Sequence, residues 1–397
     1  MEILIYEDLS VGLPQIIRMA DFLNINEFLD PLDVPSISGD EYYNKGQLGE
    51  SIALHTADHF PDLTDIDLVF VGCNEERGNG VRKPSLHSPD AIRREFFQLF
   101  QWHDQIKMAD LGNVKTGHAL KDSYAALKTV IREVTGFGKT IVILGGSHDL
   151  TLAQYYAYRE NGQTVSAVCI DAKMDLSLEM PQPAEKFLME MLTAEPNFIK
   201  QYNHIGFQSY LVHPEIMQTL DKLRFDCFRT GHVKEQIDEM EPVIRSSHLF
   251  SFDISAIANA FAPSNRITPN GFDGEQSCTL MQYAGMSESV NTIGIYGYRA
   301  TDDRDALTAK QISHMLWYLA DGRQKLKTEA KLSDLDSFNQ YHTAFNEVQS
   351  IFLQSKRTGR WWMQLPEQNY IPCSYNDYIQ ASKNQIPERW LRAQERS

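Results

Sequence analysis

The sequence predicts an α/β fold, a three-layer α/β/α sandwich with a mainly parallel sheet at its centre. Short apolar runs, such as 141–144 and 165–170, alternate along the chain with segments of helical spacing, such as 125–134. Strands of this kind are typical of parallel sheets that are covered by helices on both faces. The chain has 397 residues, of which 42% are hydrophobic, enough to bury a large core.

The elements follow in order from local signals. Ser88, Pro89 and Asp90 stand where a cap, a first turn and a favourable negative charge begin a helix. The pair Gly136 and Gly138 ends the helix predicted over 125–134. The other predicted helices cover 150–159, 214–223 and 309–319. The predicted strands cover 66–71, 141–144, 165–170, 204–207, 225–228, 249–252 and 293–296.

This pattern occupies the middle of the chain and predicts three parts. Residues 1–60 are mixed in pattern and are interpreted as an N-terminal leader packed on the main domain. Residues 61–322 carry the strand and helix alternation. Residues 323–397 begin with a charged stretch and continue with an aromatic-rich tail, which we expect to pack its Trp and Tyr side chains on the domain.

Composition limits the partners. The 37 basic and 53 acidic side chains give a net charge of -16, which repels nucleic acid and anionic membranes. No apolar stretch reaches the roughly 18 residues of a membrane span, and the first residues lack the features of a signal peptide. The five cysteines form no CxxC pair, which favours a reducing, cytoplasmic environment over a cysteine-based zinc site.

Polar side chains follow three of the predicted strands. His148 comes after two glycines in ILGGSHDL (143–150). Asp171, Lys173 and Asp175 alternate in CIDAKMDL (169–176), and Asp253 follows the strand in LFSFD (249–253). Taken singly, these are ordinary features: a turn histidine, a solvated ion pair and a helix cap. Taken together, they lie where open α/β sheets bind their ligands, at the carboxyl ends of strands.

The order of these motifs resembles the ureohydrolase family of arginase, agmatinase and formimidoylglutamase. GGxH, DAxxD and SFDxxxxxxxFAP follow one another, each at a strand end. SPDAIRREFFQL and PNGFDGEQSCTLMQYAG resemble an early and a late segment of the same family, so the resemblance covers about residues 65–320. The formimidoylglutamase branch is the most similar. The resemblance implies the arginase-type fold and two Mn²⁺ ions whose bridging hydroxide attacks a guanidine or amidine carbon.

The resemblance also implies which ligands remain. His148, Asp171, Asp175 and Asp253 match the four family residues that hold one ion. The other ion additionally needs a histidine and an aspartate, and this chain has Lys173 and Ser255 at those positions. Gly297 stands where the family has a glutamate that holds the substrate guanidinium.

These departures predict a single metal site. Three clustered carboxylates repel one another, and one divalent ion together with the Lys173 ammonium would offset their charge. We therefore expect one Mn²⁺ or another divalent ion, with Lys173 as a surrogate cation for the second, or a site that has lost its metal. A charged loop next to the site, with Glu75, Glu76, Arg77 and Arg82, is interpreted mainly as solvated.

Three functions remain open. The chain could bind a small molecule or a protein after losing efficient two-metal hydrolysis. It could hydrolyse a linear amidine with one metal and Lys173. It could also be a structural or regulatory subunit that pairs with an active relative. The resemblance implies that a homo-oligomer is possible, since the family commonly assembles, while composition says nothing about the oligomeric state. Fold kinship alone does not decide among these functions.

Overall fold

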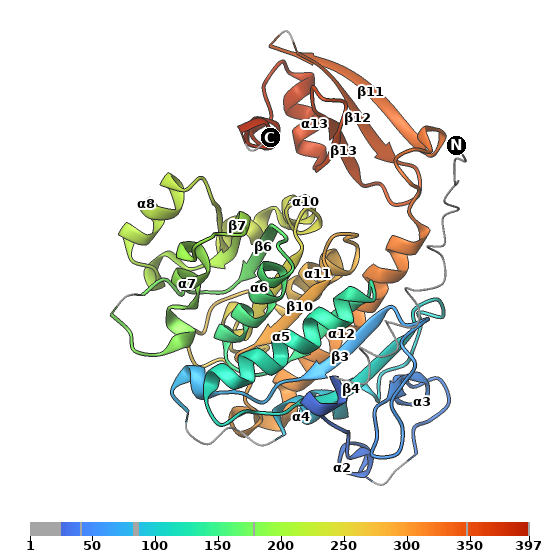
Figure 1. Cartoon of the computed structure of the whole chain (residues 1–397). Coiled ribbons are helices and arrows are strands. Elements are labelled where there is room, and N and C mark those ends of the chain that lie inside the picture. The colour runs from blue at the N-terminus through green and yellow to red at the C-terminus, as the bar shows by residue number, and fades with distance from the viewer. Residues whose placement is uncertain (1–24, 40–41, 82–86, 178, 347, 396–397) are drawn as a thin grey trace, which may run out of the picture.

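A 10-stranded sheet forms the centre of the computed structural model, which describes residues 25–39, 42–81, 87–177, 179–346 and 348–395 (Figure 1). The strand order is β1-β4-β3-β5-β10-β9-β6-β7-β8, and β2 pairs with β4. All pairs are parallel except that of β1 with β4. The predicted fold class is thus confirmed. The strands are β1 Leu29–Asp30, β2 Ala53–Leu54, β3 Leu68–Gly72, β4 Met108–Val114, β5 Thr140–Leu144, β6 Val165–Ile170, β7 Ile199–Phe207, β8 Asp226–Arg229, β9 Leu249–Asp253 and β10 Thr292–Tyr296.

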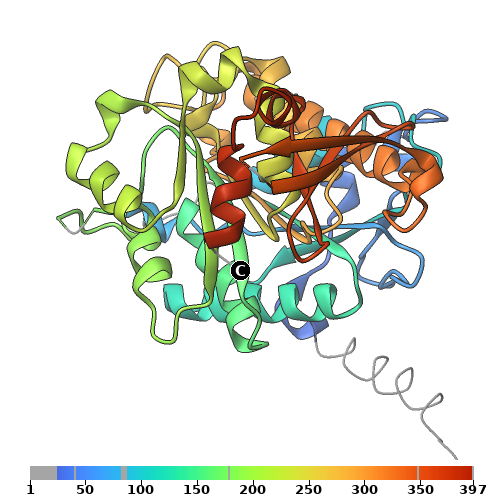
Figure 2. The ribbon, with the colours of Figure 1, turned by 90° about the horizontal axis from the view of Figure 1, so that it is seen from above.

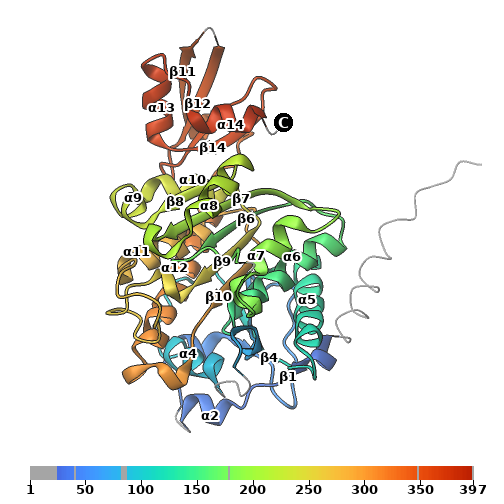
Figure 3. The same cartoon turned by 90° about the vertical axis from the view of Figure 1, so that its left-hand side faces the viewer.

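Helices cover both faces of this sheet (Figure 3). Alternate side chains of β3 show the division, because Phe70 belongs to one buried cluster while Val69 and Val71 belong to another. One face carries α4 Ser88–Phe96, α10 Met240–Arg245, α11 Gly274–Gly285 and α12 Leu307–Thr328, and the other carries α5 Leu120–Gly136, α6 Thr151–Glu160 and α7 Phe187–Thr193. Shorter helices are α2 Val34–Ser38, α3 Leu48–Ser51, α8 Pro214–Lys222 and α9 Thr230–Glu235.

The predicted elements correspond closely to the observed ones, with two instructive differences. The expected strand 165–170 coincides with β6, and helix α4 begins at Ser88 as expected. Ser88 does not cap this helix, however, because its hydroxyl accepts a hydrogen bond from the amide of Ala300. Strand β4 was not predicted from the sequence, since MADLGNV contains Asp110 and Gly112 and lacks a continuous apolar run.

The polar residues of β4 are explained by Arg93 of α4, whose side chain is fully buried. Its guanidinium donates two hydrogen bonds to Asp110, of 2.8 and 2.9 Å, and one of 2.7 Å to the carbonyl of Gly112. The remaining nitrogen donates to Asp90 and Asn113 at 2.7 Å. This bidentate pair joins α4 to the sheet. Its hydrogen bonds replace those to water that both charged groups lose on burial.

A second sheet follows helix α12. It has the order β11-β12-β13-β14 and is antiparallel throughout. The boundary predicted at residue 322 falls inside α12. The division of the chain into three parts stays a prediction. The strands are β11 Phe338–Phe345, β12 Val348–Ser355, β13 Trp361–Gln364 and β14 Tyr370–Cys373, and the helices α13 Tyr375–Ser382 and α14 Glu388–Glu395 follow them. Figure 2 shows this unit lying across one end of the main sheet.

Two buried arginines hold the second sheet against the main domain. Arg245, at the end of α10, stacks its guanidinium 4.3 Å from the centre of the Trp362 ring and donates to the carbonyl of Trp361 at 2.8 Å. Arg360 donates to the carbonyl of Met286 at 2.6 Å. Of the tail's tryptophans, Trp362 thus packs against the domain, while Trp361 and Trp390 belong to a buried cluster within the tail itself. No helix in the described residues is long and apolar enough to cross a bilayer.

The Arg93 pair leads to a prediction about stability. Arg93→Ala leaves the carboxylate of Asp110 buried without its partner, so we expect a loss of about 3–5 kcal/mol in the free energy of unfolding. Arg93→Lys should recover only part of this loss, because an ammonium cannot form the bidentate pair. Urea denaturation measures both. Arg94→Ala is the control, since the neighbouring Arg94 is exposed and its loss should cost less than about 0.5 kcal/mol. Equal losses for the two positions would contradict the role given to Arg93.

Candidate metal site

The sequence-predicted site residues meet at one edge of the main sheet. His148 follows β5, Asp171 and Asp175 follow β6, and Asp253 is the last residue of β9. These strands lie within four consecutive places of the sheet, β5-β10-β9-β6, and run parallel. Their carboxyl ends therefore deliver the side chains to the same place, although up to about a hundred residues separate them in the sequence.

Two glycines give His148 its position. Gly145 and Gly146 both have φ of +86°, a left-handed conformation that favours glycine. A Cβ on Gly146 would stand 2.2 Å from Leu150 and within 3 Å of the carbonyl oxygens of Cys73 and Glu75. Only glycine allows the chain to turn this tightly after β5, and the turn brings His148, two residues after Gly146, to the strand ends.

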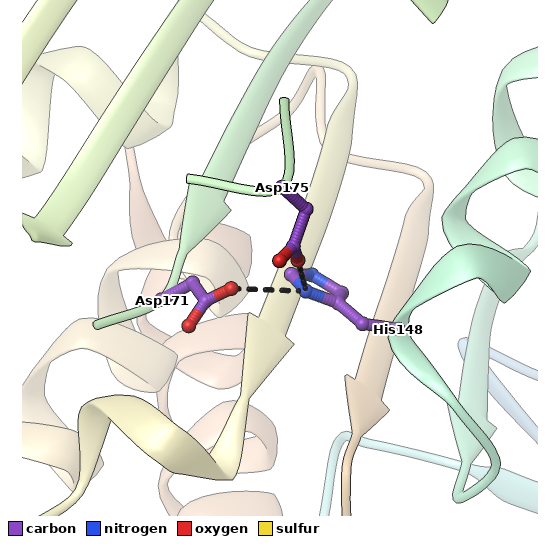
Figure 4. Close-up of side chains that lie close together, drawn as sticks. All are labelled: His148, Asp171 and Asp175. Carbon is purple, nitrogen blue, oxygen red and sulfur yellow. Dashed lines mark hydrogen bonds and ion pairs between the residues drawn. The ribbon is translucent and has the colours of Figure 1, made fainter. Parts of the chain in front are cut away.

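The imidazole of His148 lies between carboxylates on one side and a hydroxyl on the other. Figure 4 shows Asp171 and Asp175 reaching the same ring nitrogen. Their Oδ2 atoms lie 3.2 and 3.0 Å from Nδ1. On the other side Nε2 is 2.9 Å from Ser251 Oγ, which in turn lies 2.7 Å from Thr151 Oγ1. A hydrogen bond donated from Nε2 to Ser251 leaves Nδ1 as the atom that faces the carboxylates.

The second oxygens of two aspartates point away from His148 and bind protein groups. Asp171 Oδ1 accepts from the amide of Lys173 at 3.0 Å and from the hydroxyl of Ser255. Asp253 Oδ1 accepts from the amide of Ser255 at 2.8 Å, while its Oδ2 is 3.9 Å from His148 Nδ1. One oxygen of each carboxylate is therefore engaged by the protein, and the other is directed toward a single point near the imidazole.

The buried charges shift each other's pKa values. Burial would lower the pKa of His148, but its hydrogen bonds to Asp171 and Asp175 outweigh burial and hold that pKa well above the usual value. Burial also opposes ionisation of Asp171, yet the His148 partner holds the pKa of Asp171 below its usual range. Burial and then the charge of Asp171 raise the pKa of Asp175 to about 7, and the same two causes raise that of Asp253.

This set of atoms fits a divalent metal ion. Ligand atoms of His148, Asp171 and Asp175 all lie within 4.8 Å of one another, and these residues form the one such group found in the described part of the chain. One imidazole with carboxylate oxygens suits Mn²⁺ and similar ions. Asp253, the fourth residue expected from the sequence, stands slightly apart from this group, with its nearer oxygen 3.9 Å from Nδ1.

Lys173 lies close to the carboxylates but pairs with another residue. Its Nζ is 3.4 Å from Glu185 Oε1, and both side chains are about three-quarters buried. Burial would lower the pKa of Lys173, but Asp175 and Asp171 raise it above the usual value, so the ammonium stays charged. Sequence reasoning did not single out Glu185, which comes from a short turn at residues 183–185 with no motif of its own.

A cavity of about 360 Å³ opens at this point. It is lined by His148, Asp171, Lys173, Asp175, Asp253, Ser255, Asn79, Met180, Gln182, Ala184, Glu185, Ile254, Ser264, Asn265, Arg266, Ile267, Gly297, Arg299 and Asp302. Two further cationic side chains, Arg266 and Arg299, lie on the wall of this cavity, and both contact Asp302. A Cβ on Gly297, which has φ of +81°, would stand 2.7 Å from Asp253 Oδ2. The carboxylate of Asp253 therefore fills the space that a side chain at position 297 would use.

The charged loop after β3 is buried, so its interpretation as solvated was wrong for the described residues. Glu75 and Glu76 are each only 1% exposed. Glu75 pairs with Arg77 at 2.5 Å and also accepts from Ser123, while Glu76 lies 3.3 Å from Arg299. These pairs satisfy the buried charges. Arg82 lies outside the described residues.

Known proteins resemble the chain in both sequence and structure. The model of the arginase family matches residues 66–320. The formimidoylglutamase of Staphylococcus haemolyticus is 27% identical over 283 residues, which cover 66% of this chain and 88% of that protein. The structure of formimidoylglutamase from Bacillus subtilis superposes with a TM-score of 0.63 at 16% identity, covering 77% of this chain and 98% of that one.

The Trypanosoma cruzi formiminoglutamase, whose crystal structure was determined with Mn²⁺, has a TM-score of 0.60 at 16% identity and covers 67% of this chain and 96% of that one. At such identities the structural likeness supports the fold, while the family match spans well over half of the chain and includes His148, Asp171, Asp175 and Asp253. The chain belongs to the arginase family.

Proposed function

We propose that this arginase-family protein binds one divalent metal ion, with Mn²⁺ as the first candidate, and holds a small linear amidine or guanidine against it without efficient two-metal hydrolysis. His148, Asp171, Asp175 and Asp253 would hold the ion. When bound, the ion would supply Lewis acidity to the ligand. The ligand class follows from the formimidoylglutamases and the agmatine ureohydrolase that the chain resembles.

The main support is the way in which the aspartate oxygens are used. A second ion beside the first would need carboxylate oxygens that bridge the two ions. In this chain Ser255 engages Asp171 Oδ1 through its hydroxyl and Asp253 Oδ1 through its amide. The serine at 255 thus removes one ligand, and its hydroxyl occupies Asp171 Oδ1, while the backbone amide of the same residue occupies Asp253 Oδ1. This use of the oxygens supports a site for one ion.

The cavity supports a small polar ligand. Carboxylates gather at its metal-binding end, where an amidinium or guanidinium group would find negative charge. Arg266 and Arg299 lie on the wall around Asp302, where a polar or anionic tail would be accepted. Its volume of about 360 Å³ is at the small end of ligand pockets.

One alternative has an observation in its favour. The Lys173 ammonium stays charged and lines the same cavity, so it could act as a second cation in a single-metal amidine hydrolase. Its partner is Glu185 at 3.4 Å, which neutralises part of the charge that such a role needs. This partner makes the binding function the better supported of the two.

Metal content tests the proposal directly. Protein purified without chelators and incubated with Mn²⁺ should retain about one ion per chain by elemental analysis after gel filtration. Asp175→Ala should retain almost none, because it removes one ligand of a buried three-residue group. Glu185→Gln is the control, since it changes a carboxylate of the same cavity that lies outside this group. Negligible metal in the wild type, or two ions per chain, would refute the single-ion site.

Metal binding should also release protons. In the metal-free protein the raised pKa of His148 keeps Nδ1 protonated at neutral pH, and Asp175 is partly protonated because its pKa is about 7. The ion must displace these protons, so its affinity should rise with pH by about tenfold per unit for each proton displaced. Titration calorimetry in buffers of different ionisation enthalpy should show release of at least about one proton. Affinity that does not change between pH 6 and pH 8 would contradict this account.

Restoring the two family ligands tests why the second ion is lost. The double variant Lys173→His, Ser255→Asp should raise the metal content from about one to about two ions per chain, because it returns both missing donors and removes the Ser255 hydroxyl from Asp171 Oδ1. Hydrolysis of formimidoylglutamate, agmatine or arginine with Mn²⁺ should be negligible in the wild type. A metal content that stays at one ion would show that other residues, such as Gly297, exclude the second.

The same assay separates the alternative. Substantial turnover by the wild type that falls on Lys173→Met, while the metal content is unchanged, would favour the single-metal hydrolase. Turnover that needs no metal would refute both functions.

A further inference from the structure

Strand β11 forms an open edge of the C-terminal sheet. Within the described residues it pairs with β12 alone, over all eight positions from Phe338 to Phe345. In an antiparallel ladder every second residue turns its N–H and C=O groups away from the partner strand. Figure 1 shows β11 along the outer side of this sheet. Within the part of the chain that the structure describes, this row of backbone donors and acceptors, about 27 Å long, therefore has no partner strand.

The other sheet edges in the described structure are protected. Strand β1 has only two residues, and β8 has four, including Asp226 and Arg229. Strand β14 also has four residues, contains Pro372 and lies close to helix α10. Short length, charge, proline and cover by another element are the usual means by which proteins prevent edge-to-edge pairing.

Strand β11 uses none of these means. Its sequence, FNQYHTAF, contains no Lys, Arg, Asp, Glu or Pro, although 23% of the whole chain is charged. Its exposed side chains are Asn339, Gln340, His342 and Ala344, none of which is a carboxylate, an ammonium or a guanidinium group. An edge of this length without charge is one that accepts another strand.

We propose that β11 pairs antiparallel with β11 of a second copy of this chain, which joins the two four-stranded sheets into one continuous sheet. The backbone groups that point away from β12 favour an extended strand as the partner. The absence of Lys, Arg, Asp and Glu from β11 favours this part of the surface as the contact. Two copies with a net charge of -16 each repel over most of their surfaces, and the repulsion is least where an uncharged strand meets its own copy.

Symmetry limits the register of this pair. A two-fold axis perpendicular to the sheet keeps the same face of both sheets on the same side. Odd-numbered residues therefore lie opposite odd-numbered residues of the second copy, and even-numbered residues opposite even-numbered ones. Either Tyr341 or His342 then lies opposite its own copy near the axis. No residue of β11 lines the metal-site cavity, so the dimer is independent of the proposed function and leaves that cavity open.

The mass of the full chain in solution tests the proposal. Light scattering after gel filtration should show a dimer for the wild type at micromolar concentrations. His342→Lys should weaken dimerisation by about tenfold or more, because it places two ammonium groups together near the axis. This substitution lowers the overall repulsion between the acidic copies, so a weaker dimer would have to come from the strand contact itself.

Gln349→Lys is the matched control. Gln349 is an exposed residue one strand further in, on β12, where it faces Ala344. The substitution Gln349→Lys adds the same charge as His342→Lys, and the dimer should remain. A wild type that stays monomeric throughout this concentration range overturns the proposal, and so does a dimer that His342→Lys weakens no more than Gln349→Lys.

Hydrogen exchange provides a test that needs no variant. Amides of residues 338–345 that point away from β12 should exchange more slowly as the protein concentration rises, while those of β12 should not change. Exchange in β11 that is independent of concentration in a dimeric sample would assign the dimer to another surface and overturn the proposal.

Discussion

Buried carboxylates around one imidazole nitrogen are the constraint on which the site depends. Asp171 and Asp175 lie 3.2 and 3.0 Å from His148 Nδ1, at a point where water is largely excluded. Like charges cannot share such a place without a cation, because repulsion and loss of hydration both increase when the dielectric constant falls. A proton on Nδ1 or a divalent ion satisfies the same requirement. Metal binding, proton binding and the shifted pKa values are therefore parts of one balance of charge.

Three substitutions relative to the family pattern act on that balance in the same direction. The Ser255 hydroxyl engages Asp171 Oδ1, and Lys173 brings a positive charge that Glu185 partly neutralises. Gly297 leaves room for the carboxylate of Asp253 to approach. Each change is small in chemical terms. In the proposed function, they together leave ligands for one ion, while the strands and turns that carry these residues are retained.

The C-terminal unit lies apart from this chemistry. None of the described residues in 323–397 lines the metal-site cavity, which opens at the carboxyl ends of the strands. The unit is held instead through Arg245, Arg360 and the ring of Trp362. Arginine stacked on an indole combines charge with apolar contact, which suits a permanent joint between two sheets. What the unit leaves open is its far edge, the strand β11.

The sequence by itself determined the fold class and predicted the residues of the candidate site. Apolar strands alternating with helices indicated a covered parallel sheet, and His148, Asp171, Asp175 and Asp253 each followed such a strand, because strand ends are local features that a sequence displays. Only the tertiary structure decided how those residues act. The hydrogen bond from the Ser255 hydroxyl to Asp171, the Glu185 partner of Lys173 and the burial of Glu75 and Glu76 depend on contacts between segments that are separate in the sequence. Strand β4 escaped prediction for the same reason, since Asp110 is stable inside the sheet only when Arg93 reaches it from another element.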